Sequence, residues 1–236
     1  MAVKIKHCGL TSLDDARLAA DAGAWAIGMI FWPGSPRRCE LDDAAEISAA
    51  MKRRLEIAGV FVNATLDYVA RVADELDLTI VQLHGDEGPS FCREAARRTG
   101  CKVIKAMRVR SGADIQAMGG FHTDFHLLDS YIEGMPGGTG ETFAWDLAKA
   151  HKGPARVILS GGLTADNVAE AIEVVRPFAV DVASGTEAAP GRKDPEKLKA
   201  FADAVASRTA RGRPDMARPD AERADAPRHA QTGTTA

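Results

Sequence analysis

The sequence predicts a (β/α)8 barrel, an α/β fold in which eight parallel strands alternate with helices in one domain. Short β-branched runs alternate with amphipathic stretches along most of the chain, which favours a parallel sheet. Eight strand–helix pairs within residues 3–207 favour a closed (β/α)8 TIM barrel over an open doubly wound sheet. Two consecutive apolar runs near the C-terminal end also finish in glycine turns, where barrel enzymes often bind phosphate.

The elements follow one another in regular order along the chain. The expected strands are Val3–His7, Trp25–Ile30, Ile57–Val62, Leu78–Leu83, Val103–Met107, His126–Asp129, Val157–Leu159 and Val180–Ala183. The expected helices are Leu13–Ala22, Asp43–Arg53, Leu66–Leu76, Pro89–Arg98, Ile115–Met118, Trp145–Ala150, Thr164–Val175 and Pro195–Ser207. The fifth and sixth helices have the weakest pattern, because one lies among glycines and the other is short.

The composition fits one barrel domain, residues 1–208, followed by a short appendage. Of 236 residues, 45% are hydrophobic and 27% charged, which is enough to bury one substantial core. After Ser207 almost no large apolar residue remains, so we expect Thr209–Ala236 to be a disordered tail.

Charge and hydropathy exclude several classes of protein. The net charge of -3 and a pI near 6.1 give no reason to expect binding to nucleic acid or to a membrane surface. No signal peptide precedes the first strand, and no apolar run approaches the roughly 18 residues that a membrane span needs. We therefore expect a soluble cytoplasmic protein. The four cysteines show neither a CxxC motif nor a zinc spacing, so reduced thiols and no metal site are expected.

The stretch from Val157 to Asp194 is the strongest indication of a ligand. Its two apolar runs end in Ser160-Gly161-Gly162 and in Ser184-Gly185. Glycine lets backbone N–H groups crowd around an anion, and a helix that starts just beyond adds its positive end. The alternative is that these glycines only form tight turns.

Cys8 and Asp129 end the first and sixth expected strands and are candidates for proton transfer. Strand alternation puts Lys6 and Cys8 on one face and His7 on the other, and a nearby ammonium favours the thiolate. Cys8 as a small buried apolar residue is the alternative. Asp129 is followed by a glycine-rich loop, Glu133–Gly140, and a carboxyl group desolvated beneath such a loop can act as a general acid. A turn or helix-cap role for Asp129 is the alternative.

Four further polar residues are candidates for ligand contacts or for internal pairs. Gln82 and His84 alternate with apolar neighbours and should face the barrel interior, either in an internal network or against a ligand. Arg37 follows the second strand, where it could bind a carboxylate or remain a solvated surface arginine. Asp181 is an expected buried charge that needs a partner, and Lys6 is the suggested one.

Motifs along nearly all of Val3–Ser207 together resemble those of the phosphoribosylanthranilate isomerases of tryptophan biosynthesis. Each is weak alone, but their order and spacing are specific. The motifs are Lys6-x-Cys8-Gly9-Leu10-Thr11, Ser35-Pro36-Arg37, Gly59-Val60-Phe61, Val81-Gln82-Leu83-His84-Gly85-Asp86-Glu87, Leu127-Leu128-Asp129 with Gly137-Gly138-Thr139-Gly140, Leu159-Ser160-Gly161-Gly162-Leu163, and Asp181-x-x-Ser184-Gly185-x-Glu187 with Pro190-Gly191-x-Lys193-Asp194.

The resemblance implies a barrel that performs an Amadori rearrangement on N-(5-phosphoribosyl)anthranilate without a metal or organic cofactor. It implies Asp129 as general acid and Cys8 as general base. Arg37 would hold the anthranilate carboxylate, and Gly161, Gly162, Ser184 and Gly185 would hold the phosphate. The implied partner is therefore a small phosphorylated molecule, and the state of assembly, monomer or homodimer, stays open.

One residue departs from the family pattern, and two other functions compete with the implied one. His7 stands where the family usually has an apolar residue, and alternation points it towards the helices. The histidine-pathway isomerase is the closest rival, but it uses an aspartate as base where this chain has Cys8. A non-catalytic barrel that only binds a phosphorylated ligand is the second rival.

Overall fold

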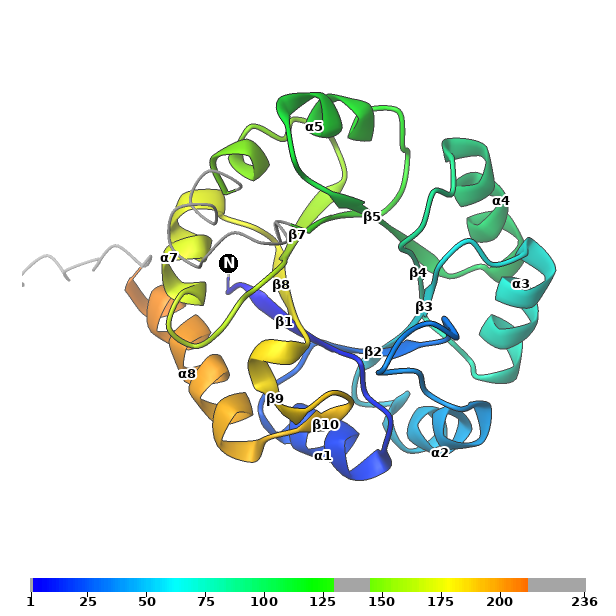
Figure 1. Ribbon diagram of the computed structural model, residues 1–236, viewed down its shortest axis with the longest axis horizontal. Helices are drawn as coiled ribbons and strands as arrows, with labels where there is room; N and C mark the ends of the chain where they lie inside the picture. Colours follow the sequence, from blue (N-terminus) through cyan, green and yellow to red (C-terminus); the bar gives the residue numbers. More distant parts are fainter. Residues whose placement is uncertain (1, 130–144, 212–236) are drawn as a thin grey trace, which may run out of the picture.

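Eight parallel strands form a closed barrel in the computed structural model, which describes residues 2–129 and 145–211 (Figure 1). Around the barrel each strand pairs with its neighbours in sequence, and β1 also pairs with β8. The strands are β1 (Lys4–Cys8), β2 (Ala26–Ile30), β3 (Glu56–Phe61), β4 (Ile80–Leu83), β5 (Lys102–Arg108), β6 (Phe125–Asp129), β7 (Arg156–Ser160) and β8 (Ala179–Val182). All eight predicted strands and the predicted (β/α)8 architecture are confirmed.

Helices surround the barrel on its outer side, as Figure 1 shows. They are α1 (Leu13–Asp21), α2 (Leu41–Met51), α3 (Leu66–Glu75), α4 (Pro89–Thr99), α5 (Gly112–Met118), α7 (Val168–Val175) and α8 (Pro195–Arg211), and residues 145–149 are also helical. Local sequence signals set several of these boundaries. The Ser12 and Thr65 hydroxyls cap α1 and α3, and α4 begins at Pro89 and ends at Gly100 in the left-handed conformation.

The bounds of several helices differ from the predicted ones, most clearly those of the seventh and eighth helices. The seventh helix begins at Val168 rather than at Thr164, because Asn167 accepts a hydrogen bond from the Thr164 N–H and holds residues 165–167 in a turn. Helix α8 continues to Arg211, so the first residues of the predicted tail are helical. The predicted glycine-rich loop Glu133–Gly140 and residues 212–236 of the tail lie outside the described residues.

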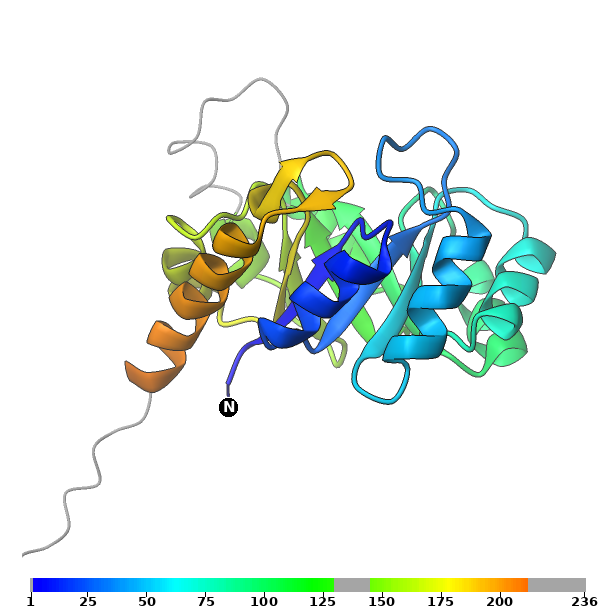
Figure 2. The ribbon, with the colours of Figure 1, turned by 90° about the horizontal axis from the view of Figure 1, so that it is seen from below.

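A small hairpin, which the sequence pattern did not predict, follows β8. One turn of 3₁₀ helix (Ser184–Thr186) leads into β9 (Glu187–Ala189), which pairs antiparallel with β10 (Arg192–Lys193). Gly191, with φ +78°, makes the turn between the two strands. Figure 2 shows this hairpin on the same rim as the loop between β2 and α2, opposite the N-terminus.

Apolar side chains fill the lower barrel interior and leave polar groups at its C-terminal rim. The interior cluster consists of Ala58, Ile80, Ile104, Ala106, Phe125, Leu127, Ile158 and Ala179. Trp25, Phe125 and Phe178, all at strand starts, pack on one another with ring centroids 5.3–5.6 Å apart and close the opposite end. The remaining core lies between strands and helices. No helix of the described residues is long and apolar enough to cross a membrane.

His7 points outward from β1, as predicted, and is fully buried beside Phe201 of α8. Among the described residues neither ring nitrogen has a hydrogen-bond partner. Burial, with smaller contributions from Lys193 and Lys6, lowers the pKa of His7 to about 3. His7 is therefore neutral at neutral pH and carries no charge that could act on Cys8.

Replacing His7 with leucine should make the fold less sensitive to acid. Because the folded-state pKa lies below the unfolded value, the unfolded chain takes up a proton that the native protein does not, and stability falls as pH drops below about 6.5. For His7 the loss at pH 5 is roughly 2 kcal/mol. We expect the difference between the free energies of unfolding in urea at pH 7 and pH 5 to shrink by about this amount in His7→Leu.

A smaller dependence will remain in that variant, because burial also lowers the pKa values of His126 and His151. The exposed His122→Gln serves as the control and should behave like wild type. An identical pH dependence in wild type and His7→Leu would contradict the assignment.

Candidate active site

The predicted proton-transfer residues lie at strand ends on the C-terminal rim of the barrel. Cys8 is the last residue of β1 and Asp129 the last residue of β6, with β7 and β8 between the two strands. His84 directly follows β4. Barrel enzymes place their chemistry at this rim, so the structure brings these candidates to the expected face.

Cys8 is buried among charged groups inside the barrel. The Lys6 ammonium lies beside it and forms a 2.7 Å ion pair with Asp181 of β8, which confirms the suggested partner of Asp181. Gly28, opposite Cys8 on β2, leaves room for both side chains, because a Cβ atom there would lie 3.0 Å from Cys8 Sγ and from Lys6 Nζ. The interior at this point is therefore polar, charged and closely packed.

The sequence predicted that Lys6 stabilises the Cys8 thiolate, but in the structure the neutral thiol is favoured. Burial raises the pKa of the Cys8 thiol above its ordinary value, and Lys6 and Lys193 offset this only in part, while Asp181 raises it further. The prediction from Lys6 alone was wrong for two reasons. Lys6 is paired with Asp181, whose negative charge opposes that of the thiolate, and burial of Cys8 disfavours the charged form. Cys8 is therefore a neutral thiol at pH 7.

Gln82, His84 and Asp129 form a chain across the interior. Gln82 is fully buried, and its Nε2 lies 3.0 Å from His84 Nδ1. On the other side of the ring, His84 Nε2 lies 3.8 Å from Asp129 Oδ2. Both predicted interior positions are confirmed. Because Gln82 donates to Nδ1, the imidazole proton is placed on Nε2, on the side of Asp129.

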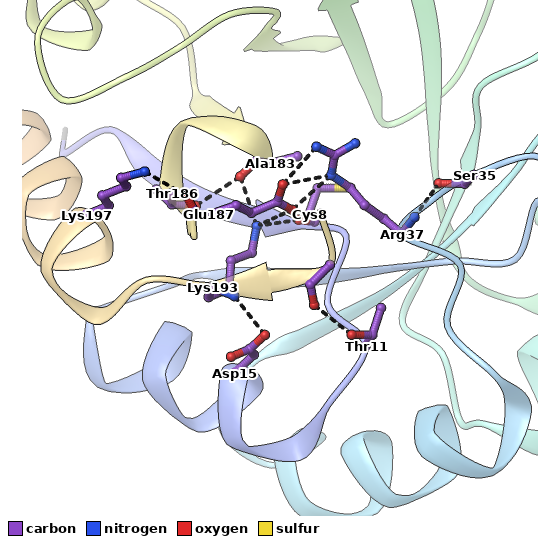
Figure 3. Close-up of polar contacts among 11 residues, drawn as sticks. Cys8, Thr11, Asp15, Ser35, Arg37, Ala183, Thr186, Glu187, Lys193 and Lys197 are labelled. Atoms are coloured by element: carbon purple, nitrogen blue, oxygen red, sulfur yellow. Dashed lines mark hydrogen bonds and ion pairs between the residues drawn. The ribbon is translucent and has the colours of Figure 1, made fainter. Parts of the chain in front are cut away.

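Arg37 is neither solvated nor free but is paired with Glu187 of the hairpin (Figure 3). Its Nε lies 2.9 and 3.0 Å from the two carboxylate oxygens, and its Nη2 lies 2.8 Å from Oε2. The solvated alternative is therefore wrong, since only 23% of the Arg37 side chain is exposed. Among the described residues Nη1 has no hydrogen-bond partner, so donors remain that can bind a second carboxylate.

The two glycine turns lie against each other at the ends of β7 and β8. Gly161 and Gly162 have φ values of +99° and +64°, and Asn167 donates to the Gly162 carbonyl at 3.0 Å. A Cβ atom on Gly185 would lie 1.9 Å from the Leu163 carbonyl oxygen, so the second turn packs directly on the first. Gly185 itself lies within one turn of 3₁₀ helix, and α8 begins at Pro195 beyond the hairpin, as predicted.

Glu187 and Lys193 are site residues to which the sequence reasoning assigned no role. Both belong to the hairpin, whose strands are too short and too charged to show a periodic pattern. The Pro190-Gly191 pair was the available signal, since it marks a turn between two short extended segments. The described residues contain no cluster of His, Cys, Asp or Glu that could hold a metal ion.

Comparisons with known proteins agree on one family. The sequence profile of the N-(5'phosphoribosyl)anthranilate (PRA) isomerase family matches residues 5–204. An N-(5'-phosphoribosyl)anthranilate isomerase from Citrifermentans bemidjiense is 47% identical over 196 residues, which cover 83% of this chain and 93% of that protein.

Two solved structures are similar over the same region. The crystal structure of phosphoribosyl anthranilate isomerase from Thermotoga maritima has a TM-score of 0.79 and 40% identity, covering 87% of this chain and 99% of its own. Another phosphoribosyl anthranilate isomerase, crystallised with reduced 1-(o-carboxyphenylamino)-1-deoxyribulose 5-phosphate, has a TM-score of 0.75 and 37% identity at the same coverage.

Replacing Gly185 with alanine should destabilise the barrel, because the new methyl group would overlap the Leu163 carbonyl oxygen. We expect the free energy of unfolding to fall by about 1–3 kcal/mol, the usual cost of overpacking. Urea denaturation measures it. The control is Gly112→Ala, where nothing lies within 4 Å of the added atom. Equal stability of Gly185→Ala and wild type would show that the two turns are not in tight contact.

Proposed function

The chain belongs to the N-(5'-phosphoribosyl)anthranilate isomerase family, and from this premise we propose that Cys8 and Asp129 carry out its proton transfers. The protein is an isomerase of tryptophan biosynthesis. It converts N-(5'-phosphoribosyl)anthranilate into 1-(2-carboxyphenylamino)-1-deoxyribulose 5-phosphate by an Amadori rearrangement. Substrate and product are isomers, so the reaction needs only proton transfers and the opening of one ring.

In the first step, Asp129 donates a proton to the furanose ring oxygen. The bond between that oxygen and C1 breaks, and the anthranilate nitrogen supplies the electron pair that forms an iminium ion at C1. The position of Asp129 supports this role, since it ends β6 on the rim and faces His84. Through Gln82, the His84 ring is held with its Nε2 proton directed towards Asp129.

In the second step, Cys8 removes the proton from C2. The electrons of the C2–H bond form a C1=C2 double bond, and the iminium nitrogen becomes a neutral amine, which gives an enolamine. Tautomerisation of the enolamine moves the C2 hydroxyl proton to C1 and leaves a ketone. The Lys6 ammonium beside Cys8 favours the thiolate that this step requires.

The carboxylate and the phosphate, at the two ends of the substrate, would each have a binding site of their own away from the reacting carbons. Arg37 retains donors for the anthranilate carboxylate, and the backbone of Gly161, Gly162, Ser184 and Gly185 would bind the phosphate. The observation that carries the assignment is that Cys8, Asp129, Arg37 and both glycine turns share one rim. An acid and a base on separate strands can then act on adjacent carbons of a substrate fixed at both ends.

We propose that the only partner the reaction needs is this small phosphorylated substrate, without a metal, an organic cofactor, nucleic acid or a membrane. A cytoplasmic location is proposed as well, because the family is biosynthetic and no described helix could cross a membrane. A monomer and a homodimer both fit a site that one chain builds from its own residues.

Cys8→Ala and Asp129→Asn should each lower the turnover of N-(5'-phosphoribosyl)anthranilate by about 10²–10⁴-fold, the usual loss for one positioned acid or base. The conversion is followed with purified protein. Two variants serve as matched controls. Cys92→Ala removes a buried thiol of helix α4, outside the barrel interior, and Asp74→Asn changes an exposed carboxylate. No turnover by wild type would overturn the isomerase function, and full turnover by either variant would overturn that residue's role.

The raised pKa of Cys8 should appear as a late ionisation of its thiol. Because burial raises this pKa above the ordinary value of roughly 8.5, we expect the ultraviolet absorbance of the Cys8 thiolate to develop only at higher pH. The difference in absorbance between wild type and Cys8→Ala, titrated between pH 6 and pH 10, measures this ionisation. A difference that is fully developed below pH 8 would contradict a buried neutral thiol.

A further inference from the structure

Arg37 is fixed at three points along its length. Its backbone N–H donates to the Ser35 hydroxyl at 3.1 Å. Its aliphatic part packs on Gly9, where a Cβ atom would lie 2.7 Å from Arg37 Cδ, and Gly9 itself has φ +76°. Its guanidinium makes the three hydrogen bonds to Glu187 described above. A long and flexible side chain is thus held in one orientation beside Cys8 (Figure 3).

Glu187 is in turn held by groups of the hairpin and of α8. Its carboxylate is 3.4 Å from the Lys193 ammonium, and its backbone carbonyl accepts a hydrogen bond from Lys197 at 2.8 Å. The Glu187 side chain is only 4% exposed. Burial alone would raise the pKa of Glu187, but the hydrogen bonds from Arg37 and the charge of Lys193 keep this pKa below its ordinary value. Glu187 is therefore a carboxylate.

Lys193 connects this pair to the strand that carries Cys8. Its ammonium donates to the Cys8 carbonyl at 2.8 Å and to the Ala183 carbonyl at 3.0 Å, and it is buried. Its backbone N–H donates to Asp15 of α1 at 2.9 Å. Figure 3 shows Lys193 between Cys8, Ala183 and Glu187. The hairpin is thus anchored to the end of β1, the end of β8 and the first helix.

We propose that Glu187 is a positioning residue that orients Arg37 for the substrate carboxylate, with Lys193 tying this pair to the strand end at Cys8. The inference rests on the proposed role of Arg37. A substrate carboxylate bound by the remaining donors of Arg37 would then have a fixed place relative to the Cys8 thiol. Without Glu187 the guanidinium would regain rotamer freedom, and binding would have to pay for its ordering.

The sign of the effect separates positioning from simple electrostatics. Glu187 is an anion close to the place where the substrate carboxylate would bind, so by charge alone it weakens binding. Neutralising Glu187 would then tighten the binding of a carboxylate ligand. If Glu187 acts by orienting Arg37, the same change instead weakens that binding.

The test compares two ligands of the full-length protein. One is reduced 1-(o-carboxyphenylamino)-1-deoxyribulose 5-phosphate, and the other is the same molecule without the carboxyl group. We expect Glu187→Gln to weaken the first ligand about tenfold and to leave the second within about twofold, as measured by calorimetry. Glu187→Asp keeps the negative charge but moves it away from Arg37, so it should also weaken only the ligand that has the carboxyl group. This variant provides a second test in case Glu187→Gln does not fold. The exposed Glu196→Gln is the matched control.

An Arg37→Ala background completes the experiment. There Glu187→Gln should have no further effect on the ratio of the two affinities, whereas a purely structural role would weaken both ligands in either background. KM of the folded Glu187→Gln enzyme should rise about tenfold while kcat changes less than about threefold.

The possible failures are distinguishable. If Arg37→Ala changes the ratio but Glu187→Gln and Glu187→Asp do not, or if Glu187→Gln tightens the carboxylate ligand, the positioning role is overturned and the proposed function stands. If Arg37→Ala leaves the ratio unchanged, the proposed carboxylate-binding role of Arg37 is itself wrong.

Discussion

Closure of the barrel between its first and last strands is the constraint on which the site depends. At this seam Lys6 and Asp181 are register partners and form a buried ion pair inside the barrel. Such a pair adds little stability over well-packed apolar residues, but removing one partner typically costs about 3–5 kcal/mol because the other charge is left uncompensated. The pair lies next to Cys8. The buried Lys6 ammonium is therefore placed where a cation favours the Cys8 thiolate.

The charges around Cys8 do not cancel. Lys6, Lys193 and Arg37 contribute three cations, against which stand the carboxylates of Asp181 and Glu187. The excess of one positive charge among these five groups suits a substrate that carries a carboxylate and a phosphate. Each cation is nevertheless hydrogen-bonded to a carboxylate, which keeps its direction fixed. The site thus combines attraction for anions with side chains whose geometry is set before the substrate arrives.

The sequence predicted the features that follow from periodicity and missed those that depend on the sum of many contacts. Alternation along β1 was enough to place Lys6 and Cys8 inside and His7 outside, and Lys6 was suggested as the partner that a buried Asp181 needs. The raised pKa of Cys8 was not predictable in this way, because burial and three charged neighbours, Lys6, Asp181 and Lys193, set it together. The Arg37–Glu187 pair joins residues 150 positions apart through a hairpin of strands too short to be recognised. The start of α7 was misplaced because the Asn167 side chain competes with the helix for backbone groups.

The ties of the hairpin to the first strand have a consequence for the order in which the protein forms. Lys193 reaches back 185 positions to Cys8 and 178 positions to Asp15, and Lys6 meets its partner 175 positions later. These contacts join residues far apart in the sequence. Closing such long loops has a large entropic cost, so we expect the contacts to form late in folding. During synthesis, when only the first seven strands have left the ribosome, the chain still lacks Asp181, Glu187 and Lys193, which complete the surroundings of Cys8. Assembly of the base and its charged neighbours is therefore a terminal event, and truncated chains cannot acquire this part of the site.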